Sequence, residues 1–147
     1  MHTDPLELEA LELHLLPNKI TQAHWNNIYQ VMKEYIEHLH EDQIASYPEK
    51  AIIDRKICTG HIHIHIKRSF TTDAVLLYSD LCSYINKTSP LILLGVTNEY
   101  GKLSTPLIMD LIVMMQSHIP GKVLIKGYIH PQDWLKSIDR LQKQGYI

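Results

Sequence analysis

The sequence predicts a single α/β (α+β) domain built on a mixed sheet of about four to five strands. Three observations carry this prediction. They are a strictly alternating segment at 61–66, a continuous apolar run at 91–96, and helical periodicity in the segments around them. The chain has 147 residues, 45% hydrophobic and 20% charged, which is typical of one globular domain with its own core.

The N-terminal segment, residues 1–47, is expected to hold one short element and an amphipathic helix. Leucines alternate with polar residues from Leu6 to Leu16, which favours a bulged strand, although the same residue types are strong helix formers. Thr21 can cap a helix that runs to about Ile44 and ends before Pro48. Its expected buried stripe consists of Trp25, Ile28, Met32, Tyr35, Ile36 and Leu39.

The second region, 51–147, alternates strands and helices in a βαβαβα order. The expected strands are 51–58, 61–66, 91–96 and 123–129, and the expected helices are 71–85, 105–118 and 131–144. We expect 91–96 and 123–129 to be neighbouring parallel strands, joined by the intervening helix as a right-handed crossover.

Two helices of this region carry more specific expectations. Asp110 interrupts the apolar helix 105–118, where it either faces solvent beside Gln116 and Ser117, as we expect, or is buried and paired. The expected buried stripe of the last helix consists of Trp134, Leu135, Ile138 and Leu141.

Composition limits the classes of function. A net charge of −2 argues against a protein built around a nucleic-acid backbone. No segment approaches the roughly 20 apolar residues of a membrane span, and the first residues are acidic where a signal peptide is basic. Cys58 and Cys82 are expected to be two buried thiols in a reducing compartment. We therefore expect a cytoplasmic protein that contacts no membrane.

The most unusual segment is His61-Ile62-His63-Ile64-His65-Ile66. Because side chains alternate on a strand, its three isoleucines point to one face and its three histidines to the other. Imidazoles spaced in this way can converge on a divalent metal such as zinc or manganese, so His61, His63 and His65 are candidate ligands. The simpler interpretation is a strand that buries isoleucine and half-exposes histidine.

The His-hydrophobe-His pattern resembles the motif of HUH endonucleases, in which two histidines hold a cation beside a nucleophilic tyrosine. The resemblance implies Tyr78 or Tyr84 as nucleophile, with Tyr84-Ile85-Asn86-Lys87 similar to the family's YxxK element.

A polar loop between the strand 91–96 and the helix 105–118 is the candidate partner-binding segment. Such a loop lies at the end of the sheet where α/β domains tend to bind ligands, and Ser104 or Thr105 would cap the helix at a site that favours an anion. The candidate binding residues are Asn98, Glu99, Tyr100, Lys102, Ser104 and Thr105.

Within 51–147, five segments form a further pattern: Leu91–Val96, Ser104-Thr105-Pro106-Leu107, Val123–Gly127, Trp134–Ile138 and Gly145-Tyr146-Ile147. This pattern resembles the STAS domain of anti-sigma-factor antagonists. The resemblance implies a non-enzymatic regulatory module that binds a protein partner, with Ser104 and Thr105 as candidate positions for the family's phosphorylation switch. The alternatives are a metal-binding protein or metal-dependent enzyme that uses the three histidines, and a nickase of the HUH type.

Overall fold

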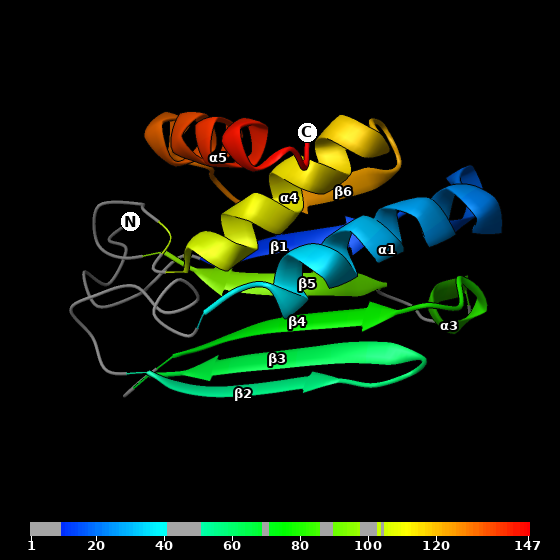
Figure 1. The fold of residues 1–147 in the computed structure, drawn as a ribbon, viewed down its shortest axis with the longest axis horizontal. Helices are drawn as coiled ribbons and strands as arrows, with labels where there is room; N and C mark the ends of the chain where they lie inside the picture. The colour runs from blue at the N-terminus through cyan, green and yellow to red at the C-terminus, as the bar shows by residue number, and fades with distance from the viewer. Residues whose placement is uncertain (1–9, 41–50, 69–70, 86–89, 98–102, 104) are drawn as a thin grey trace, which may run out of the picture.

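A computed structural model describes residues 10–40, 51–68, 71–85, 90–97, 103 and 105–147 (Figure 1). Six strands form one sheet in the order β2-β3-β4-β5-β1-β6, and every neighbouring pair is antiparallel. The elements in chain order are β1 (Ala10–Leu15), the 3-10 turn η1 (Pro17–Lys19), α1 (Gln22–Glu37), β2 (Ile52–Ile57), β3 (His61–Lys67), β4 (Thr72–Tyr78), α3 (Cys82–Ile85), β5 (Leu91–Val96), α4 (Pro106–His118), β6 (Val123–Lys126) and α5 (Pro131–Gln144).

The long helices form a layer on one side of the sheet. Figure 1 shows α1 and α4 crossing in front of the strands, with α5 beside α4. Every residue from Leu107 to Met115 is buried, because α4 packs against the sheet and lies between α1 and α5 within this layer. This confirms the heavy burial expected from its apolar sequence.

The strand β3 distinguishes the two faces of the sheet, one toward the helices and one away from them. Ile62, Ile64 and Ile66 are fully buried toward the helix layer, and His61, His63 and His65 lie on the opposite face. We call that opposite side the histidine face. The alternation predicted for this strand is therefore confirmed.

The predicted helix at 71–85 is wrong, because residues Thr72–Tyr78 form β4 and only Cys82–Ile85 are helical. Ala74, Leu77, Tyr78 and Leu81 do have helical spacing, which explains the misleading pattern. The strand's true inward residues are Asp73, Val75 and Leu77, and a charged residue at the first of these positions hides the alternation.

The predicted pairing of β5 with β6 is also wrong. The two strands run in the same direction, but β1 is inserted between them and is antiparallel to both. Leu13 of β1 lies opposite Leu93 on one side and Ile125 on the other. The sheet is therefore antiparallel and six-stranded rather than mixed and four- to five-stranded, and the N-terminal strand is part of it.

The remaining elements agree with expectation more closely. The strand interpretation holds for the described part of the leucine-rich segment, and Thr21 caps α1, its Oγ1 accepting a hydrogen bond of 3.2 Å from the His24 backbone nitrogen. Leu135 is 65% exposed rather than buried, and Trp134 and Ile138 are partly buried beside Leu141.

Both cysteines are exposed, contrary to prediction. Cys58 follows the end of the edge strand β2 and Cys82 begins the short helix α3, so neither side chain reaches the core between the sheet and the helices. Within the described part of the chain, no helix has the length and apolar character needed to cross a membrane.

Candidate functional site

The histidine face is assembled by the register of β2, β3 and β4. His61 lies opposite Tyr78 of β4, and His63 lies between Lys56 of β2 and Leu76 of β4. Directly opposite residues in an antiparallel pair share a face, so these side chains are neighbours. The histidines are thus flanked by a lysine on one side and by an aromatic and an aliphatic residue on the other.

One row of side chains crosses the whole face. From the edge strand β2 to the edge strand β6 it consists of Asp54, His65, Ala74, Leu94, Glu12 and Lys126. Charged residues lie toward the two ends of this row and aliphatic residues at its centre. Leu76 and Leu91 enlarge the half-buried aliphatic centre on the same face. The histidine face is therefore an apolar strip with a charged margin.

The imidazole rings are packed closely at one end of the face. The centroids of His61 and His63 lie 4.6 Å apart with the rings tilted by 52°, and the centroid of Tyr78 lies 6.2 Å from that of His63 in an edge-on arrangement. Across the residues that the structure describes, no three His, Cys, Asp or Glu side chains gather so that they could hold a metal ion. This geometry therefore gives no support to a metal site formed by His61, His63 and His65 together.

The two tyrosines implied by the HUH resemblance occupy different places. Tyr78 is half-buried and lies on the histidine face, opposite His61. Tyr84 is 1% exposed, donates its hydroxyl hydrogen to the Leu76 carbonyl at 3.0 Å and accepts from the Tyr78 nitrogen at 2.9 Å. Burial raises the pKa of Tyr84, which keeps it protonated. The buried Tyr84 side chain thus holds the end of β4 in place through two hydrogen bonds to its backbone.

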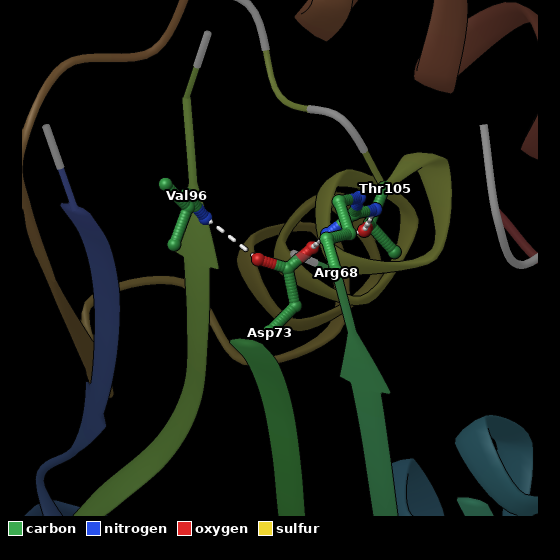
Figure 2. Close-up of polar contacts among 4 residues, drawn as sticks. All are labelled: Arg68, Asp73, Val96 and Thr105. Atoms are coloured by element: carbon green, nitrogen blue, oxygen red, sulfur yellow. Dashed lines mark hydrogen bonds and ion pairs between the residues drawn. The ribbon is translucent and has the colours of Figure 1, made fainter. Parts of the chain in front are cut away.

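A buried polar cluster lies where β3, β4 and β5 approach the start of α4 (Figure 2). Asp73 is fully buried; its Oδ2 lies 2.9 Å from Nη1 of Arg68 and accepts from the Thr105 hydroxyl, and its Oδ1 accepts from the Val96 nitrogen at 2.9 Å. Nη2 of Arg68 donates to the Thr105 Oγ1 at 2.6 Å. Because a buried charge needs a partner, the cluster fixes the helix to three strand ends.

Sequence reasoning missed this cluster, since Arg68 and Asp73 lie only five positions apart across a strand connection and resemble an ordinary polar turn. Thr105 does precede the helix, and Pro106 occupies the first turn as predicted. The Thr105 hydroxyl, however, makes no capping hydrogen bond, because it donates to Asp73 and accepts from Arg68. Thr105 is fully buried, so it does not lie on an exposed binding surface.

The other candidate loop residues, Asn98, Glu99, Tyr100, Lys102 and Ser104, lie outside the described residues. The described neighbour Leu103 donates its backbone N–H to Asp133 Oδ2 at 3.1 Å, which ties the chain before α4 to the first turn of α5.

Asp110 does not face solvent as expected but is 4% exposed and paired between helices. Its Oδ1 accepts from Ser137 and from Nη2 of Arg140, each at 2.6 Å, and its Oδ2 accepts from the Tyr35 hydroxyl. Burial, together with the neighbouring Asp110 carboxylate, raises the pKa of Tyr35. The network joins α1, α4 and α5 and so holds the three helices of the layer together.

Comparison of the chain with protein-family models, curated proteins and solved structures gave no match in any of the three. The resemblances to STAS domains and to HUH endonucleases therefore stay predictions.

Proposed function

We propose that this chain is a non-enzymatic regulatory or protein-interaction module that binds a protein partner through the histidine face. The observation that carries the proposal is the half-buried strip of Ala74, Leu76, Tyr78 and Leu94 across the middle of that face. Apolar and aromatic side chains that form a contiguous patch with a polar margin are typical of interaction surfaces.

The margin of the strip favours an acidic partner. Among the described residues, Lys56, Lys67 and Lys126 lie on this face with the carboxylates of Asp54 and Glu12. The fixed charge of this described part is therefore positive, although the chain as a whole carries −2. Protonated histidines would add to the positive charge. Opposite potentials guide association and exclude wrong partners, so we expect a protein surface with an apolar patch bordered by carboxylates.

The buried carboxylates support a non-catalytic role. Asp73 is neutralised by Arg68, and Asp110 by Arg140, and each also accepts hydrogen bonds from neighbouring hydroxyl groups. Charges that are paired and hydrogen-bonded in this way hold elements together. The regulatory loop implied by the STAS resemblance, with Tyr100 and Ser104, is a competing contact region.

Site-specific photo-crosslinking separates these surfaces. A photoreactive residue replaces the exposed His65 on the histidine face, Tyr100 in the loop, or the exposed Lys136 on α5 as matched control. We expect a specific protein adduct from position 65, and none from position 136. An adduct from position 100 or 136 without one from 65 would contradict the proposal. The captured protein, once identified, provides the ligand for affinity measurements.

A second candidate function, divalent metal binding, is favoured by the 4.6 Å separation of the His61 and His63 rings. Two imidazoles at this distance can share one ion, with water or a partner supplying the other ligands. Calorimetric titration with zinc and with manganese tests it. Saturable binding in the parent that is lost in His63→Ala supports this function, and equal heats in both exclude it.

A further inference from the structure

The strand β2 forms one edge of the sheet, and among the described strands it has a neighbour only on the β3 side. It pairs with β3 over six consecutive positions without a register shift, so the edge is regular. Ile52 is 73% exposed and Ile57 36% exposed at its two ends. Regular edge strands with exposed apolar residues are templates for pairing with another strand.

The hydrogen-bond pattern shows which residues of β2 are available for pairing. The Cys58 nitrogen donates to the His61 carbonyl at 2.9 Å, which begins the ladder between the two strands. Because hydrogen-bonded and non-hydrogen-bonded pairs alternate, Ile52, Asp54 and Lys56 direct their backbone groups to β3. Ile53, Arg55 and Ile57 direct theirs to the free edge.

We propose that two copies of this chain pair antiparallel through β2, with Arg55 of each copy at the two-fold axis. This register places Ile53 opposite Ile57 and lets both residues and Arg55 exchange backbone hydrogen bonds. It joins the two sheets, and the two histidine faces, into one continuous surface. The proposal stands independently of the partner proposed above, because it uses the edge of the sheet and not its face.

Charge selects this register. With Arg55 on the axis, Asp54 of each copy lies opposite Lys56 of the other. A register centred on Asp54 or on Lys56 would instead place two carboxylates or two ammonium groups opposite each other, which is unfavourable. Lys56 Nζ already lies 4.0 Å from Asp54 Oδ2 within one chain, so pairing gives each charge a second partner of opposite sign.

The guanidinium of Arg55 is placed so that the two arginines at the axis do not repel each other strongly. Two arginines opposite each other would repel, but Nη1 of Arg55 donates to the carbonyl oxygens of Ile36 at 3.0 Å and Leu39 at 2.8 Å. The guanidinium is thus turned onto the C-terminal end of its own α1. Carbonyl groups at a helix C-terminus carry partial negative charge that offsets the positive charge.

Charge exchange tests the register by sedimentation of the full chain. We expect concentration-dependent dimerisation of the parent, about tenfold weaker dimers for Asp54→Lys and for Lys56→Asp alone, and recovery in the double variant. An equimolar mixture of the two single variants should form heterodimers, because each supplies the charges that the other needs. A parent that stays monomeric up to about 1 mM, or single variants that dimerise as the parent does, would overturn the proposal.

A disulfide tests the same register without changing charge. Ile52 of one copy would lie opposite Cys58 of the other, so Ile52→Cys on a Cys82→Ser background should form covalent dimers on mild oxidation. The background protein alone is the matched control, because its two Cys58 residues would lie roughly 20 Å apart along the paired strands. No dimer from the Ile52→Cys variant, or equal dimer from the control, would contradict the register.

Discussion

The side chain of Asp73 and the backbone nitrogen of Val96 form a 2.9 Å hydrogen bond that joins the start of β4 to the end of β5. Only two residue pairs connect these strands directly, Ala74 with Leu94 and Val75 with Leu93. The carboxylate therefore extends a short strand pairing, and the same group neutralises Arg68 and accepts from Thr105.

Replacing Asp73 with Ala should lower the free energy of unfolding by about 3–5 kcal/mol, because Arg68 would be left as a buried charge without its carboxylate. Thr105→Val, which removes one hydroxyl and keeps the shape, should lower it by about 1–2 kcal/mol. Urea denaturation monitored by circular dichroism measures both. An equal decrease in the free energy of unfolding for both variants would show that the Arg68–Asp73 ion pair contributes no more than the Thr105 hydroxyl.

Leu111→Asp should be severely destabilising, since Leu111 is fully buried on α4 and the new carboxylate would have no partner. The matched control is Leu135→Asp on α5, at a position that is 65% exposed, where we expect a change within about 0.5 kcal/mol. Thermal melting gives both values. Similar melting temperatures for the two variants would mean that α4 is not the central helix of the layer.

Gly127→Ala tests the insertion of β1 beside β6. Gly127 has a φ of +114°, and a Cβ there would lie 2.6 Å from the Ala10 carbonyl oxygen and 3.2 Å from Leu11 Cα. Gly121 has a φ of +76° with open space around it, so Gly121→Ala carries the backbone strain of about 1 kcal/mol without the clash. Chemical denaturation should show a loss at position 127 larger by at least about 1 kcal/mol. An equal loss of stability in Gly127→Ala and Gly121→Ala would argue against the position of β1 beside β6.

Stability should fall at alkaline pH because of the buried tyrosines. Burial raises the pKa of Tyr84 and Tyr35 above the ordinary value of 10.0, so above pH 10 the unfolded chain releases protons that the folded chain retains. The two protonated tyrosines therefore contribute their full stabilisation of the folded state below pH 10, and this contribution falls as the pH rises above 10. Tyr84→Phe should lower the unfolding free energy by about 1–2 kcal/mol at pH 7 and reduce its decline above pH 10. An unchanged decline in urea titrations at pH 8 and 10.5 would contradict this origin.

The sequence predicts elements well where one local pattern decides them. The isoleucine–histidine alternation of β3 predicts its strand directly, since this strand has one buried face. The continuous apolar run of β5 also predicts a strand, but not the burial on both faces that such a run indicates, since Leu94 is only half-buried on the histidine face. The pattern of β4 fails because Asp73 occupies a core position that a hydrophobic residue usually fills. Its burial depends on Arg68 and Thr105, and this partnership leaves no periodic signal.

The sheet order could not be predicted because β1 pairs with strands far along the chain. The apolar faces of β1, β5 and β6 are equally compatible with a direct pairing of β5 and β6, and no local residue records that a third strand lies between them. The same limit applies to the candidate site. The common face of the three histidines follows from alternation, but Lys56, Tyr78 and Ala74 become their neighbours only through the register of β2 and β4.

The partner binding proposed for the histidine face is tested by the dissociation constants of two matched variants. Leu76 lies half-buried at the centre of that face, and Leu135 lies exposed on α5. With the partner captured at position 65, Leu76→Asn should weaken binding about tenfold or more, while Leu135→Asn should bind as the parent does. Parent-like affinity in both variants, or a loss confined to Leu135→Asn, would mean that the histidine face is not the binding surface.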